Sequence, residues 1–137
     1  MYNEIIAGIM KQLKDLFPEA GIGTIPLEEG ITKPYFEVGL LETYEKPVNG
    51  QRYFRSVSMY VNYYGPDSQH SITDRNQVLD VLMDKLEYVT LDNGSLIRGT
   101  NRRGKNEGNV LSFQVEYQVH ILKPGEPKNS MEDIKLK

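Results

Sequence analysis

The sequence predicts an α+β fold: a mainly antiparallel β-sheet with long hairpins and two α-helices packed on one face, in the order α-β-β-β-α-β-β. Residues 111–121 alternate strictly between apolar and polar side chains, which is typical of a strand with one dry face. Two other segments place apolar residues at helical spacing. Asn-Gly turn signals lie between further strand-like runs, which indicates hairpins.

The strand at 111–121 organises the rest of the chain. Its apolar positions are Leu111, Phe113, Val115, Tyr117, Val119 and Ile121. A helix would scatter these positions around its circumference, whereas a strand sends all of them to one side. That dry face needs partners, and we expect the two helices to cover it.

The first helix is predicted over 3–16, with Asn3 as its N-cap and Pro18 as its stop signal. The second is predicted over 73–87, with Ser71 or Thr73 as its cap. Its apolar stripe contains Val78, Leu82 and Leu86. Both apolar stripes are expected to pack on the sheet.

The remaining strands follow from turn residues and alternation. Residues 21–27 are expected to form a short edge strand, because Pro26 cannot donate a ladder hydrogen bond. A long hairpin with a projecting tip is expected from strands at 33–44 and 53–64. Short strands flank the turn at 92–94, and residues 101–109 are expected to form a second polar tip.

Three aromatic side chains lie on the nominal outer face of the strand at 53–64: Phe54, Tyr60 and Tyr64. Aromatic residues on such a face indicate a surface covered by another segment or subunit. The alternative is that they form cross-strand pairs in an ordinary hairpin. The sequence leaves both interpretations open.

Length and composition narrow the class of protein. The 137 residues predict one domain at 1–124, followed by a polar, mobile C-terminal segment at 125–137. The absence of cysteine excludes disulfides, thiol catalysis and Cys-ligated zinc. A net charge of −3 gives no global reason to expect nucleic-acid binding. No signal peptide or membrane span is recognisable, so we expect a soluble, cytosolic protein with no membrane partner.

No catalytic, cofactor or metal motif is recognisable in the sequence. The only histidines are His70, expected in a loop, and His120, expected on the wet face of its strand. Glu116 and His120 share that face and are the most specific candidates for catalytic residues. Glu28 and Glu29 are expected to form a solvated loop rather than a metal site, because no third ligand lies nearby. We therefore expect no enzyme activity and no cofactor.

Four basic residues, Arg98, Arg102, Arg103 and Lys105, lie within eight positions. They could contact phosphates, which makes a small nucleic-acid-binding α+β module the alternative function. A solvated tip or a protein contact is favoured, because no aromatic residue for base stacking lies between the charges.

The chain resembles the tail terminator family of long-tailed phages and prophages. The most specific stretch is 86–101, LEYVTLDNGSLIRGTN, followed by GNVLSF at 108–113 and Glu116-Tyr117. The front half also resembles the family in Leu16-Phe17-Pro18, in KPYF at 33–36 and in Arg52-Tyr53. The resemblance covers about residues 1–122.

The resemblance implies a structural virion protein that forms a ring, usually of six subunits, on the finished tail tube. Its partners would be other copies of itself, the tail tube protein and the head-completion or connector proteins. DNA that passes through the lumen would be a further possible partner. It would assemble in the bacterial host cytoplasm and remain in the virion tail. On this basis Phe54, Tyr60 and Tyr64 are expected in a subunit interface. Arg98, Arg102, Arg103 and Lys105 are expected to face the lumen or the tube.

Overall fold

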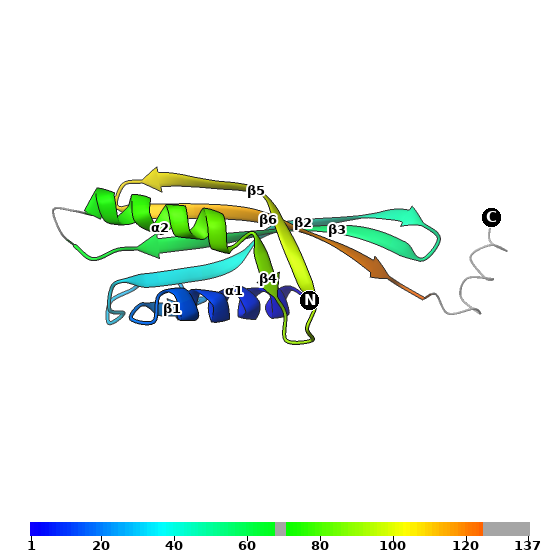
Figure 1. Ribbon diagram of the computed structural model, residues 1–137, viewed down its shortest axis with the longest axis horizontal. Coiled ribbons are helices and arrows are strands. Elements are labelled where there is room, and N and C mark those ends of the chain that lie inside the picture. The colour runs from blue at the N-terminus through cyan, green and yellow to red at the C-terminus, as the bar shows by residue number, and fades with distance from the viewer. Residues whose placement is uncertain (68–70, 125–137) are drawn as a thin grey trace.

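The computed structural model describes residues 1–67 and 71–124 (Figure 1). Its elements are α1 (Tyr2–Leu16), β1 (Gly21–Gly23), β2 (Tyr35–Asn49), β3 (Arg52–Tyr64), α2 (Ser71–Lys85), β4 (Tyr88–Thr90), β5 (Leu96–Glu107) and β6 (Val110–Leu122). The predicted α+β class is confirmed. The expectations for His70 and for the segment 125–137 lie outside the described residues.

The strands form one sheet in the order β1-β2-β3-β6-β5-β4. Among the described strands, β1 and β2 run parallel and the other neighbouring pairs are antiparallel. The predicted organising strand is β6, which pairs with β3 from Arg52↔Leu122 to Tyr64↔Val110. Its other edge pairs with β5, so β6 lies inside the sheet.

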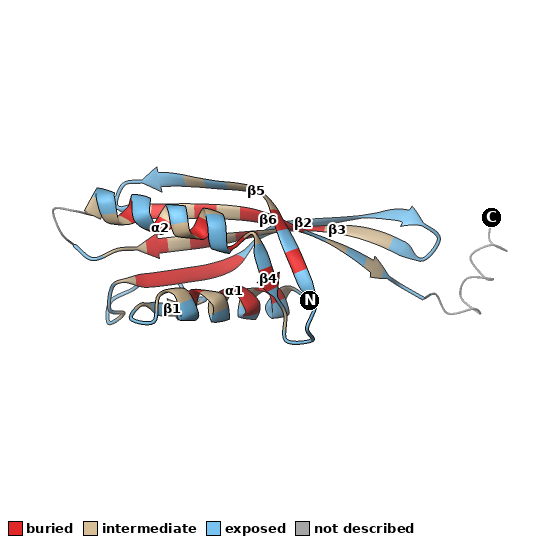
Figure 2. Cartoon of the chain, in the orientation of Figure 1, coloured by how far each residue is buried: buried red, intermediate tan, exposed pale blue. Residues whose placement is uncertain are grey.

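Both helices pack on the same face of the sheet, which we call the inner face (Figures 1 and 2). Helix α1 contributes Ile5, Ile9 and Leu13 to the core, and α2 contributes Val78 and Leu82. The inner sides of β3 and β6 supply Val57, Met59, Val61, Leu111, Phe113, Val115 and Tyr117. Neither helix covers the opposite, outer face.

The predicted helix boundaries need small corrections. Asn3 is not the N-cap of α1, because the helix already begins at Tyr2 and Met1 takes the cap position without a side-chain hydrogen bond. The Met1 amino group instead pairs with Glu4 at 3.2 Å, which puts negative charge in the first turn. Helix α2 begins and ends two residues earlier than predicted.

Two strand predictions were wrong. The strand expected over 21–27 ends at Gly23, and the carbonyl of Ile25 accepts a hydrogen bond from the Tyr35 hydroxyl at 2.7 Å instead of joining a ladder. The expected polar tip at 101–109 is mostly strand, because β5 continues to Glu107. Its inner side carries Gly104, where a Cβ would lie 2.3 Å from Leu79 of α2. The Leu79 side chain therefore occupies the space that a side chain at Gly104 would need.

Part of the sheet extends beyond both helices. We call this part the arm and define it as residues 40–55 and 118–123 (Figures 1 and 2). It contains the β2–β3 hairpin and the end of β6, and residues 40–52 are all exposed. The remainder of the described chain is called the body.

Candidate assembly surface

Three side chains on the outer face converge on the carboxylate of Glu37. The hydroxyls of Tyr60 and Tyr64 donate to its two oxygens at 3.0 and 2.9 Å, and Asn62 Nδ2 donates at 3.4 Å. Ser112 on β6 donates in turn to Asn62 Oδ1 at 2.9 Å. Glu37 is only 6% exposed, although neither α1 nor α2 covers this face. These hydrogen bonds hold the hydroxyl groups of both tyrosines in place on the outer face.

The same contacts hold the tyrosines in their neutral form. Burial, followed by the hydrogen bond to the Glu37 carboxylate, raises the pKa of Tyr64 to about 12. The pKa of Tyr60 is raised by the same two causes in the same order. Both hydroxyls therefore remain hydrogen-bond donors at neutral pH.

Gly39 makes room for Tyr60. The two residues are partners in the β2–β3 register, and a Cβ at Gly39 would lie 2.5 Å from the Tyr60 hydroxyl oxygen. The ring therefore lies across the backbone of the neighbouring strand. Sequence reasoning missed Glu37 and Gly39 as members of this surface. The sequence feature that could have indicated them is the occurrence of one carboxylate, Glu37, and one glycine, Gly39, within an otherwise hydrophobic strand.

Phe54 is not part of the Glu37 cluster. It lies six residues before Tyr60 on β3, a separation of about 20 Å along a strand. In the arm it contacts Tyr44 and His120, with ring centroids at 6.2 and 5.6 Å. The structure thus brings Tyr60 and Tyr64 together and places Phe54 farther along the same face.

The four basic residues of β5 have different partners, and strand alternation sends the neighbours Arg102 and Arg103 to opposite faces. Arg98 and Arg102 approach Glu87 at 3.2 and 3.9 Å, beside the end of α2. Arg103 and Lys105 are exposed and point to the outer face, where they contact Gln114 and Glu107. The predicted single basic tip is therefore two separate pairs.

Arg102 has a local structural role. Its guanidinium donates to the carbonyl of Met83 at 2.9 Å and to the carbonyl of Gly99 at 2.8 Å. These bonds tie the last turns of α2 to the irregular part of β5 between Thr100 and Arg103. Its positive charge also favours the helix C-terminus.

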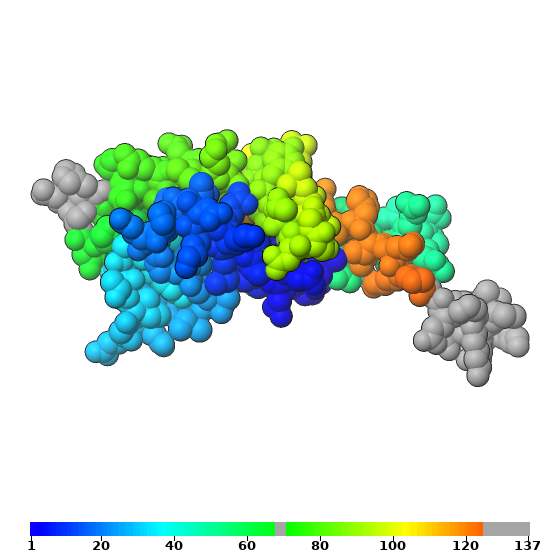
Figure 3. Space-filling model, turned by 60° about the horizontal axis from the view of Figure 1, so that its bottom comes forward, coloured from blue at the N-terminus to red at the C-terminus, as the bar shows by residue number. Residues whose placement is uncertain are grey.

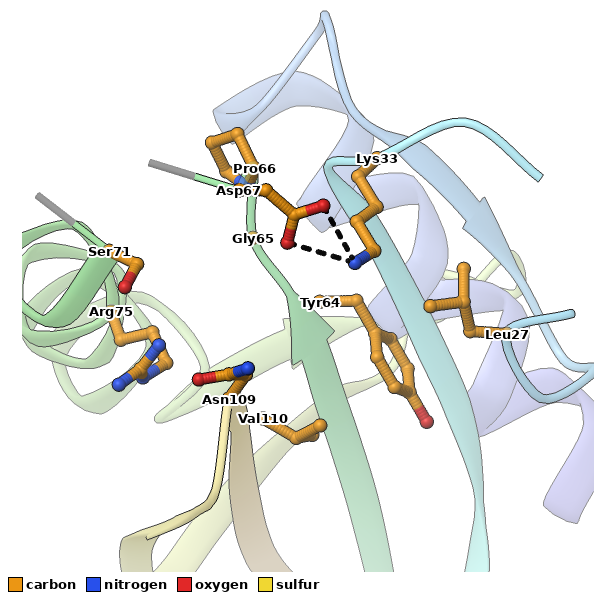
Figure 4. Close-up of a pocket in the computed structure, with 10 residues that line it drawn as sticks. All are labelled: Leu27, Lys33, Tyr64, Gly65, Pro66, Asp67, Ser71, Arg75, Asn109 and Val110. Atoms are coloured by element: carbon orange, nitrogen blue, oxygen red, sulfur yellow. Dashed lines mark hydrogen bonds and ion pairs between the residues drawn. The ribbon is translucent and has the colours of Figure 1, made fainter. Parts of the chain in front are cut away.

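A polar pocket of about 420 Å³ lies where β3 ends and α2 begins (Figure 4). Its described lining residues are Leu27, Lys33, Tyr64, Gly65, Pro66, Asp67, Ser71, Arg75, Asn109 and Val110. Lys33 pairs with Asp67 at 3.2 Å across its mouth, as the dashed lines in Figure 4 show. Arg75 donates to Asn106 at 3.2 Å. No histidine or cysteine is among the described lining residues.

The other candidate sites gain no support. Glu116 accepts a hydrogen bond from Asn101 at 3.1 Å, whereas His120 packs against Phe54, so their contacts go to different neighbours. Within the described ranges, no three His, Cys, Asp or Glu residues gather as metal ligands, and this includes Glu28 and Glu29.

Neither helix in the described part combines the length and apolar character that a membrane crossing requires.

The fold and its surfaces define a class of small α+β protein whose sheet is covered by helices on one side and presents an uncovered face on the other. The sequence family described as phage tail terminator protein matches residues 4–129. The chain therefore belongs to the phage tail terminator family, a family of structural phage tail proteins. A comparison with curated proteins found no match.

Proposed function

We propose that this chain closes the finished tail tube as a ring, of six copies as is usual in the family, and joins it to head-completion proteins. The observation that carries the proposal is the uncovered outer face with its hydrogen-bonded Glu37, Tyr60 and Tyr64 cluster. A cyclic ring joins two different surfaces of each subunit. The outer face, including Tyr60, Tyr64 and the more distant Phe54, forms part of one of these surfaces.

The basic residues of β5 face the ring lumen or the tube. Arg98, Arg103 and Lys105 provide the contact because their side chains are exposed, whereas Arg102 orients the strand through its carbonyl bonds. Positive charge here also suits DNA passing through the lumen. We expect that replacing Arg103 and Lys105 with Glu blocks tail completion, and normal virions from that mutant would contradict this contact.

The chain acts through shape and contact surfaces, without an enzyme activity, a cofactor or a membrane partner. It assembles in the cytoplasm of the bacterial host and remains in the virion tail. Its partners there are further copies of the chain, the tail tube protein and the connector proteins.

Self-assembly is tested with the double substitution Tyr60→Ser and Tyr64→Ser. We expect the wild-type protein to reach the mass of a multimer in light scattering and the variant to remain near the monomer mass. Tyr88→Ser is a matched control, because Tyr88 is an exposed tyrosine on β4, away from the Glu37 cluster. Circular dichroism confirms that each variant is folded. A Tyr60/Tyr64 variant that is folded and keeps the wild-type mass would exclude this interface.

A further inference from the structure

The arm exposes a group of large apolar side chains. Leu40, Leu41, Tyr44, Val48 and Leu122 are all exposed, and Val48 and Leu122 reach 56% and 64%. Single exposed apolar residues are ordinary, but several on one projecting element indicate an interaction surface.

The backbone of the arm is also incompletely paired. Strand β1 pairs with β2 at 35–37, and no other described strand pairs with the outer edge of β2 along the arm. Strand β5 leaves β6 at Tyr117, so within the described ranges residues 118–122 of β6 pair with β3 alone. Open edges offer backbone N–H and C=O groups to another chain.

A complementary groove lies at the other end of the molecule. It has a volume of about 290 Å³ and lies where α1 ends and β2 begins. Its lining is mostly apolar and consists of Leu16, Phe17, Pro18, Glu19, Ala20, Pro34, Phe36 and Tyr63. Figure 3 shows these two ends on opposite sides, with the arm at the right and residues 24–34 at the left.

The charges of the two ends are opposite. The arm contains four basic residues, Lys46, Arg52, Arg55 and Lys123, and two acidic ones, Glu42 and Glu45. Arg55 and Lys123 both bond Glu45, whereas Lys46 and Arg52 have no carboxylate partner among the described residues. Residues 19–34 contain Glu19, Glu28 and Glu29, and their one cation, Lys33, pairs with Asp67. Complementary charge of this kind selects partners and fixes their register.

We propose that the arm of one copy docks on the opposite end of the next copy. Val48 at the arm tip enters the groove at the end of α1, and Lys46 and Arg52 face Glu19, Glu28 and Glu29 of the neighbour. The contact joins unlike surfaces, so repeating it produces a closed ring when the rotation closes. This inference rests on the proposed ring and names the surfaces at which its subunits meet.

Cysteine cross-linking tests the contact directly, because the chain has no native cysteine. The double variant Val48→Cys with Glu19→Cys is oxidised and run on a denaturing gel. Docking predicts a ladder of cross-linked multimers, which neither single variant can produce. The matched control pairs Val48→Cys with Asp92→Cys, an exposed residue of the β4–β5 turn, and should give no ladder.

Charge exchange tests the register of the contact. One variant reverses the arm with Lys46→Glu and Arg52→Glu, and a second reverses the other end with Glu19→Lys and Glu28→Lys. Each alone should need at least about tenfold more protein to assemble, because like charges then meet. An equimolar mixture should recover wild-type assembly in rings of alternating variants, and misfolded proteins could not recover in this way.

The outcomes separate the two proposals. A wild-type multimer without the cysteine ladder, or a mixture that assembles no better than its components, would overturn arm docking and leave the ring standing. A wild-type protein that forms no ring either in solution or on isolated tail tubes would contradict the proposed ring, and arm docking with it. A ladder together with recovery in the mixture would support both.

Discussion

The body and the arm share the strands β2, β3 and β6 but are stabilised differently. In the body the inner faces of β2, β3 and β6 lie under the helices, and Val57, Met59 and Phe113 are fully buried. In the arm the same alternation continues without a cover. The helices have 15 residues each and span about 22 Å, whereas the 15 residues of β2 span about 50 Å. The strands exceed the helices in length, so the arm extends beyond the part of the sheet that the helices cover.

The largest expected difference between the regions is in stability. Phe113→Ala should lower the free energy of unfolding by about 3–5 kcal/mol, because it leaves a cavity in a closed core. Phe54→Ala in the arm should lower it by about 1 kcal/mol, the value of a partly exposed aromatic contact. Urea unfolding measures both. Equal losses would mean that the arm is as firmly packed as the body.

The two pairs of basic residues provide a smaller comparison. Arg102→Ala removes the donors to the carbonyls of Met83 and Gly99 and should lower the free energy of unfolding by about 1–3 kcal/mol. Arg103→Ala, on the exposed outer face, should change it by about 0.5 kcal/mol or less. The same urea titration reports both values. If Arg103→Ala lowered the free energy of unfolding more than Arg102→Ala does, contacts on the outer face would be the ones that stabilise β5.

The smallest expected effect is a pH dependence in the Glu37 cluster. The pKa of Tyr64 is about 12 in the folded state against 10.0 for the free side chain, so folding favours the neutral phenol. Its contribution to stability is complete below pH 10 and is lost as the pH rises toward 12. Tyr64→Phe should therefore flatten the fall in unfolding free energy over this range. Tyr88→Phe is the control, and an unchanged slope in Tyr64→Phe would contradict the assignment.

The sequence predicted those parts of the fold where side-chain pattern and burial agree. The alternation from Leu111 to Ile121 gave β6, and helical spacing gave α1 and α2 within two residues. The sequence did not predict that β5 continues beyond Thr100. In this part of the strand Gly104 lies under α2 and the polar residues face solvent. Apolar and polar side chains therefore do not alternate there.

The candidate surface was only partly predictable. The pattern placed Tyr60 and Tyr64 on the outer face, but nothing local indicated that both would bond Glu37 on another strand. The basic residues of β5 were close in sequence, yet strand geometry sent Arg102 and Arg103 to different partners. Contacts of this kind depend on register between distant segments.

Imaging of isolated phage tails that carry this protein is the most direct test of assembly through exterior surfaces. We expect electron microscopy to show a closed ring of copies at the end of the tube, with each arm and outer face against a neighbouring copy. A single copy at the tube end, or copies whose arms and outer faces all point into solvent, would contradict the account.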